Sequence, residues 1–201
     1  KNSKGWYRRS FTVPVEWKNV RVLLRFDGVQ SAFCVWVNGQ TVGFFQNSFS
    51  PAEFDITDFL CEGENLLAVE VIAYSAGTYL EDQDMWRLAG IFRDVSLEAV
   101  PVVGIRDFQV ETILTGDCKE AELKVRIKVQ NAGKEVSSPC RADVYLDNEL
   151  IAAGYTGMRN SDWPVNIWKS EDNGPVYVDM EREILPNTIR TMYLQSIVKN
   201  V

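Results

Sequence analysis

The chain contains no histidine among its 201 residues. This absence excludes Ser-His-Asp and Cys-His catalysis and histidine ligation of a metal. The sequence also lacks a phosphate-cradling loop of the GxGxxG or GxxxxGK[ST] type. No apolar run approaches the roughly 18 residues of a membrane span, and nothing at the start resembles a signal peptide. We therefore expect no membrane partner, and we interpret the abrupt start at Lys1 as a cut end.

Clusters of basic residues are missing as well. The chain has 21 Lys and Arg against 28 Asp and Glu, which gives a formal net charge of −7. Nucleic-acid binding needs clustered cations, so we expect no nucleic-acid partner, and a neutral or cationic partner is easier to accommodate. The charge balance leaves the cellular compartment undecided.

The four cysteines have no CxxC spacing, which argues against a zinc site. We expect free thiols rather than a disulfide framework in a chain of this size. The residues are Cys34, Cys61, Cys118 and Cys140.

The apolar residues that are present alternate with polar ones at period two, which is typical of half-buried strands. This pattern runs through residues 20–26 and 121–129, and further strands are predicted over residues 66–74 and 91–99. Asn38-Gly39 separates two β-rich runs and is the pair that a two-residue type I′ hairpin turn favours. A helical turn is expected only over residues 55–63, with Asp55 or Thr57 as its cap and Gly63 at its end.

These elements predict an all-β chain built from sandwiches. The proline-bearing join Val100–Gly104 separates an aromatic-rich block from a block of longer, more charged strands. We therefore predict one domain over residues 1–101 and a second over residues 102–201. Residues 157–174 are too polar and too long for a hairpin, and we expect a surface excursion there that docks in part.

The densest acidic cluster beside aromatic residues is the acidic elbow, the name used here for residues 78–95. It places Glu81, Asp82 and Asp84 between Tyr79 and Trp86. One interpretation is a solvated turn whose charge is balanced by nearby arginines, Arg87 and Arg93. The other is that the large apolar neighbours become buried and fix the carboxylates, which then suit a sugar hydroxyl or a hard cation.

Two long strings resemble a known family. They are "FDGVQSAFCVWVNGQTVGFFQNSFSPAEFDITDFLCEGENLLAVEV" at residues 26–71 and "YLEDQDMWRLAGIFRDVSL" at residues 79–97. Both are similar to the sugar-binding jelly roll of glycoside hydrolase family 2, and within it to the bacterial β-galactosidases. The resemblance runs from Gly5 to about Pro101. More weakly, residues 105–201 resemble the immunoglobulin-like domain that follows in these enzymes.

The resemblance implies a retaining hydrolase of terminal β-galactosides whose two catalytic glutamates lie in a later TIM barrel. Such a barrel needs about 250 residues of its own, and the 201 residues are used by the two β-domains. We therefore expect no catalytic residue in this chain and no turnover by it alone. In the full-length enzyme the missing barrel would be a partner, and the resemblance also implies a homo-oligomer.

One site residue carries over from the family pattern. The second aspartate of the LEDQD string, Asp84, is expected to contact galactose hydroxyls and to help hold a sodium ion that is shared with the barrel. A carboxylate suits both tasks because it is an acceptor with two hard oxygens. Magnesium is possible only through the absent catalytic domain, and no cofactor is expected to bind this chain tightly. No role carries over to Glu81 or Asp82, for which loop shaping or pairing with an arginine is expected.

The remaining aromatic residues are interpreted as structural. Four of them flank the Asn38-Gly39 turn and are expected in the core or at a domain contact rather than in a sugar-stacking platform: Phe33, Trp36, Phe44 and Phe45. Trp86 could either anchor the acidic elbow or line a pocket.

The chain departs from the family pattern at both ends. Jelly rolls of this type begin several strands earlier, and the immunoglobulin-like domain continues beyond Val201. Both sandwiches are therefore expected to be truncated, with unpaired edges that favour aggregation or pairing with a neighbouring copy.

Other functions stay open at this point. The chain could be a free-standing carbohydrate-binding module or a purely structural pair of sandwiches. It could also belong to another glycosidase of the family, a glucuronidase or a mannosidase, because the pocket that decides the sugar lies in the barrel.

Overall fold

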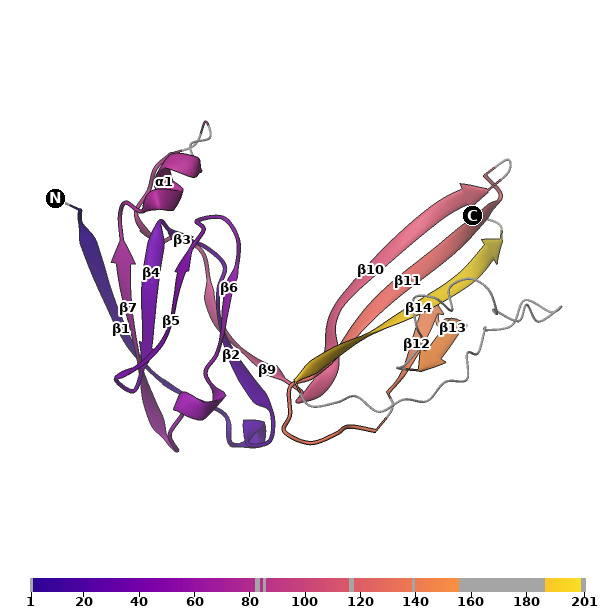
Figure 1. The fold of residues 1–201 in the computed structure, drawn as a ribbon, viewed down its shortest axis with the longest axis horizontal. Coiled ribbons are helices and arrows are strands. Elements are labelled where there is room, and N and C mark those ends of the chain that lie inside the picture. Colours follow the sequence, from indigo (N-terminus) through magenta and orange to yellow (C-terminus); the bar gives the residue numbers. More distant parts are fainter. Residues whose placement is uncertain are drawn as a thin grey trace. The chain divides into compact units, whose positions relative to one another are not determined.

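The computed structural model describes residues 2–81, 84, 86–115, 118–138, 140–155 and 187–199. The chain divides into two compact units, Lys1–Pro101 and Val102–Val201, and each is treated by itself (Figure 1). Strands dominate both units, and the α-helix α1 (Ala76–Leu80) has only five residues. The all-β prediction is confirmed. The excursion expected over residues 157–174 lies outside the described residues.

The first unit contains a four-stranded and a three-stranded antiparallel sheet. The larger sheet has the order β1-β7-β4-β5, with β1 at Lys4–Thr12, β7 at Glu64–Ile72, β4 at Ala32–Val37 and β5 at Gln40–Gln46. The smaller sheet has the order β6-β2-β9, with β6 at Ala52–Asp55, β2 at Arg21–Phe26 and β9 at Val95–Val100. A short pair, β3 (Val29–Gln30) and β8 (Gly90–Ile91), and two 3₁₀ turns, η1 (Val15–Trp17) and η2 (Thr57–Phe59), complete the unit.

Alternate residues of the two sheets form one core, because period-two strands turn every second side chain to the same face. Phe26 of β2 and Phe33 of β4 lie with ring centroids 4.9 Å apart, so the two sheets meet face to face. The buried core residues are Val22, Leu24, Phe26, Val29, Phe33, Val35, Val37, Ala52, Ile56, Val69 and Val71. This arrangement is the sandwich that the alternation predicts.

The predicted hairpin turn is present between β4 and β5. Asn38 and Gly39 both have positive φ, 51° and 78°, as a type I′ turn requires. The Asn38 side-chain NH₂ donates to Asn65 Oδ1 at 2.7 Å and to the Phe59 carbonyl at 2.9 Å. The Asn38 side-chain oxygen accepts from the backbone amide of Leu66 at 2.9 Å. The turn is therefore tied to the start of β7.

One predicted strand is wrong. Residues 91–99 were expected to form a single strand, but β8 ends at Ile91 and β9 begins at Val95. Between them the Phe92 amide donates to the Gly28 carbonyl at 3.2 Å, and the Asp94 carbonyl accepts from the Asp27 amide at 3.0 Å. These hydrogen bonds turn the backbone, so the two short strands join different sheets.

The second unit consists of a three-stranded sheet and a hairpin. The sheet has the order β10-β11-β14, with β10 at Val103–Thr115, β11 at Glu120–Asn131 and β14 at Thr188–Lys199. The hairpin joins β12 (Arg141–Leu146) to β13 (Glu149–Tyr155). The core of the second unit contains Val125, Ile127 and Val129 of β11, which confirms the alternation predicted over residues 121–129.

All four cysteines are free thiols. In the part of the chain that the structure describes, none of the helices has the length and apolar character needed to cross a membrane.

Replacing Asn65 by alanine should destabilise the first unit. Asn65 is 1% exposed, its oxygen accepts from the Cys61 amide at 2.8 Å, and its NH₂ donates to the Cys61 and Gly63 carbonyls at 3.1 Å each. The change removes a fully buried side chain together with its hydrogen bonds, which should lower the free energy of unfolding by about 2–3 kcal/mol. Urea denaturation measures it, with the exposed Gln40→Ala as control, and equal stability of the two variants would contradict the prediction.

Candidate functional site

The acidic elbow begins inside helix α1, which follows β7 along the chain. Helix α1 starts with a reciprocal cap, in which the Ser75 amide donates to Thr78 Oγ1 at 3.0 Å and the Thr78 amide donates to the Ser75 carbonyl at 3.2 Å. At the other end, the Glu81 amide donates to the Gly77 carbonyl at 2.8 Å. Thr78 is the only residue of α1 that is buried. The helix is thus a short turn at the end of the sandwich with a single buried residue (Figure 1).

The Glu81 side chain anchors the elbow to the sandwich. Its two carboxylate oxygens accept hydrogen bonds from the Ser48 amide at 3.0 Å and from the Ser48 hydroxyl at 2.6 Å. Ser48 is fully buried in the loop between β5 and β6. Hydrogen bonds to an ionised acceptor are shorter and stronger than neutral ones. The contact with Ser48 therefore gives the predicted loop-shaping role of Glu81 a physical basis.

The loop that receives Glu81 is itself held in place. The Asn47 side-chain oxygen accepts from the amides of Phe49 and Ser50 at 3.2 Å and 3.1 Å. The Phe49 ring lies edge-on to Phe92 with centroids 6.0 Å apart. Arg93 donates to the Phe49 carbonyl at 3.4 Å and lies over the Phe92 ring. These contacts link the loop at Ser48 to the end of the elbow.

The expectation that bulky neighbours become buried and fix the carboxylates is wrong. The exposed fractions are 74% for Tyr79, 86% for Leu80, 87% for Trp86 and 59% for Leu88. The physical reason is that a helix of five residues has too few positions to lay an apolar face on the sandwich. Trp86 accordingly does not anchor the elbow within the first unit. Asp82 and Met85 lie outside the described residues.

Asp84 follows Glu81 by three positions, and it is exposed. A carboxylate in this position can accept hydrogen bonds from sugar hydroxyls or offer oxygen to a hard cation. Within the described ranges there is no group of three or more Asp, Glu or Cys side chains that could enclose a metal ion. Asp84 could therefore supply one ligand to a cation, but the described residues do not supply a complete coordination shell.

The four aromatic residues beside the hairpin turn divide between the two faces of β4 and β5. Phe33 is fully buried, and Phe45 packs on the same core, as predicted. Phe44 pairs with Cys34 of β4 and is exposed, so it is not part of the core, and the domain contact that was the other expectation for it stays a prediction. Trp36 stacks on Trp6 of β1 with centroids 5.9 Å apart and an interplanar angle of 30°.

The Trp6–Trp36 pair was missed by the sequence analysis. Trp6 is 64% exposed, and beside it Lys4 forms a 2.7 Å ion pair with Glu70. Burial, followed by the negative charge of Glu70, raises the pKa of the adjacent Cys34 thiol. The signal that could have found this face is the alternation of β1, in which Trp6 and Arg8 occupy one face while Tyr7, Arg9 and Phe11 occupy the other.

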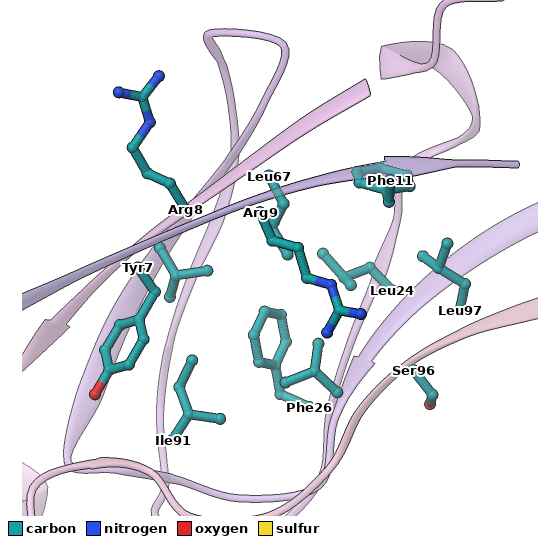
Figure 2. A pocket seen from close by; sticks show the side chains of 12 residues that line it. Tyr7, Arg8, Arg9, Phe11, Leu24, Phe26, Leu67, Ile91, Ser96 and Leu97 are labelled. Atoms are coloured by element: carbon teal, nitrogen blue, oxygen red, sulfur yellow. The ribbon is translucent and has the colours of Figure 1, made fainter. Parts of the chain in front are cut away.

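A cavity of about 550 Å³ lies between β1 and β9 on the opposite face of β1 (Figure 2). Both strands are the outermost members of their sheets among the described strands. Figure 2 shows Arg9 extending into the cavity while Arg8 extends away from it. The lining residues are Tyr7, Arg8, Arg9, Phe11, Leu24, Phe26, Leu67, Val69, Ile91, Val95, Ser96 and Leu97. The floor is thus mainly apolar, with one guanidinium group reaching across it.

Comparison with known proteins places these features in a family. The family model described as "Glycosyl hydrolases family 2, sugar binding domain" matches residues 1–101. A β-galactosidase of Clostridium acetobutylicum is 49% identical over 148 residues, which are 74% of this chain and 16% of the relative. A β-galactosidase of Yersinia pestis is 38% identical over 192 residues, which are 92% of this chain and 18% of the relative. The chain therefore spans less than a fifth of the length of these relatives.

Solved structures show the same fold. The crystal structure of Bacteroides uniformis β-glucuronidase matches all of this chain and 22% of its own with a TM-score of 0.72 and 22% sequence identity. A putative β-galactosidase from Bacteroides fragilis matches with a TM-score of 0.72 and 20% identity, over 100% of this chain and 28% of its own.

Arg9 is expected to keep the open edge of the first unit from self-association. An inward-pointing charge on an edge strand opposes pairing with another strand, because covering the cavity would remove the guanidinium group from water. Arg9→Leu should therefore lower the concentration at which the chain associates by about tenfold or more. A tenfold change requires only about 1.4 kcal/mol of association free energy. Arg8→Leu on the same strand is the matched control. Sedimentation velocity measures both, and equal association of the two variants would refute this role.

Proposed function

This chain belongs to glycoside hydrolase family 2, and from that premise we propose that it is the non-catalytic N-terminal part of a retaining β-galactosidase that acts on terminal β-galactosides. The relatives of 38–51% identity carry the name β-galactosidase, and this supports a galactoside as substrate. The Bacteroides uniformis β-glucuronidase is 22% identical, which supports a shared fold. A galactoside is therefore the favoured substrate class.

We place the catalytic pair outside these 201 residues. A retaining glycosidase needs two carboxyl groups about 5–5.5 Å apart, one as acid and base and the other as nucleophile. The densest acidic cluster in the sequence, Glu81, Asp82 and Asp84, includes a glutamate whose two oxygens already accept from Ser48. The proposed catalytic module is a barrel elsewhere in the full-length enzyme, and this chain alone is expected to be inactive.

The observation that carries the proposal is the exposed carboxylate of Asp84 on an anchored elbow. Asp84 would accept hydrogen bonds from galactose hydroxyls and would offer one oxygen to a shared sodium ion. When bound, sodium would supply a positive charge that holds sugar oxygens in place. In this proposal the chain positions the Asp84 oxygens for binding and takes no part in bond cleavage.

The exposed apolar residues of the elbow fit the same proposal. Tyr79, Leu80, Trp86 and Leu88 form an unusually apolar segment beside Asp84 for a region in contact with water. A catalytic module that covers these side chains would exclude water around the aspartate and strengthen its contacts to sugar and cation.

A second candidate function is supported by the Trp6–Trp36 pair. Trp6, which stacks on Trp36 and stays exposed on the sheet face, can stack on the apolar face of a sugar ring, and the exposed Lys4 beside it can donate to sugar hydroxyls. On this interpretation the chain is a carbohydrate-binding module whose sugar site lies on the outer face of the larger sheet.

Asp84→Asn in the full-length enzyme should reduce kcat/KM for a nitrophenyl β-galactoside by about 10²-fold and weaken its sodium dependence. The loss is that expected for one charged contact in the transition state. Hydrolysis is measured across a sodium titration, with the exposed Asp58→Asn as control. The 201-residue chain assayed alone should show no hydrolysis, and activity of Asp84→Asn equal to that of Asp58→Asn would remove Asp84 from the site.

The binding-module alternative makes a different prediction. If the outer face of the larger sheet is the sugar site, the 201-residue chain should bind galactose or lactose measurably, and Trp6→Ala should abolish most of that binding because stacking area is lost. Calorimetric titration with lactose tests it, and Tyr145→Ala, an exposed aromatic residue of the second unit, is the control. An absence of heat for the unmodified chain would reject this alternative.

A further inference from the structure

We infer that Glu81 is a positioning residue of the proposed sugar and sodium site, acting through Ser48. The inference rests on the proposed function of Asp84 and deepens it, because it names the contact that sets where the Asp84 carboxylate lies. Nothing in the family resemblance assigns a role to Glu81.

Both oxygens of the Glu81 carboxylate are committed to Ser48. Oε1 accepts from the backbone amide at 3.0 Å and Oε2 from the hydroxyl at 2.6 Å, which is a two-point contact with one residue. Ser48 has no exposed surface, whereas Asp84 is exposed. Both Glu81 oxygens are therefore already occupied by hydrogen bonds to Ser48. We assign the direct contact with sugar or sodium to Asp84.

The polar anchor replaces the apolar one that the sequence predicts. Because Tyr79, Leu80 and Trp86 are largely exposed, burial of these side chains does not restrain the elbow within the first unit. Among the described residues, the Glu81 side chain joins the C-terminal end of α1 to the sandwich through its two hydrogen bonds to Ser48, while Thr78 is the buried residue of the helix. The Glu81 backbone is also fixed from the helix side by its bond to the Gly77 carbonyl.

Ser48 can act as an anchor only if its own loop is rigid, and three independent contacts restrain that loop. Asn47 accepts from the two following amides, Phe49 packs edge-on against Phe92, and Arg93 donates to the carbonyls of Phe49 and Asp27 at 3.4 Å and 3.3 Å. Phe92 and Arg93 belong to the far end of the acidic elbow. The loop therefore ties both ends of the elbow together, with Asp84 between them.

The consequence is a separation of roles between two residues that lie three positions apart. Glu81 fixes the base of the elbow, and Asp84 presents its oxygens. Loss of the anchor should allow Asp84 to sample more positions, so that the entropy of ordering it must be supplied when sodium or galactoside binds. The expected signature is weaker apparent binding of sodium that high sodium concentration restores, rather than loss of chemistry at saturation.

The test uses the full-length enzyme with Glu81→Ala, Ser48→Ala and the double variant, and with the exposed Glu62→Ala as matched control. Activity toward a nitrophenyl β-galactoside is measured across a sodium titration. Hydrogen exchange at the Ser48 amide and the melting temperature are measured on the same samples. Glu81→Ala should raise the sodium concentration for half-maximal activity by about tenfold, the size expected for a lost charge-assisted contact. Ser48→Ala should shift it less, because the amide contact remains, and the double variant should be no worse than Glu81→Ala.

Three outcomes separate the inference from the proposal on which it rests. Faster exchange at Ser48 with a raised sodium requirement in Glu81→Ala supports the inference. A lower melting temperature with an unchanged sodium requirement overturns it and leaves only a structural role for Glu81, while Asp84→Asn still reports on the proposed function. If Asp84→Asn leaves activity and sodium dependence unchanged, the proposed function itself fails and the inference falls with it.

Discussion

The apolar contact between the two sheets of the first unit is the constraint on which the rest of its structure depends. Phe26 and Phe33 meet across it, and the strands on either side can place only every second residue into the shared core. The remaining residues of each strand must face away, and the connections must leave at the ends of the sandwich. That geometry leaves the loops, the outer sheet face and the open edge at β1 and β9, where the cavity lies, as places for chemistry.

A loop at the end of a sandwich can present a side chain precisely only when something other than the main core holds it. In this chain the restraint is polar: a carboxylate at the end of a one-turn helix bonds a buried serine of another loop. A charged acceptor directed at a backbone amide and a hydroxyl also fixes orientation, which apolar packing of a five-residue helix does not. This explains how the elbow can leave its large side chains exposed and still start from a defined position.

The proposed function follows the same division of labour. In a glycosidase the reacting carboxyl groups must sit at a set separation on rigid elements, which a later catalytic module would provide. A sandwich placed before that module can contribute a single carboxylate and an apolar surface without taking part in bond cleavage. The exposed Trp86 beside Asp84 has the character of a surface that becomes buried in a larger assembly.

Local chemistry determined much of the fold. Period two places alternate residues of β2 and β11 in the core, although Leu23 on the other face of β2 is buried as well. Asn38-Gly39 fixes a turn because few other pairs tolerate positive φ twice. The family resemblance named Asp84 from its string of neighbours alone. Only the tertiary structure decided what lies beside what: Ser48 and Glu81 are 33 residues apart in the chain, and Trp6 and Trp36 lie on different strands that are joined through β7. It also decided that the rings of the elbow stay exposed, because burial depends on whether a facing surface exists, and a pattern of residue types along one segment does not contain that surface.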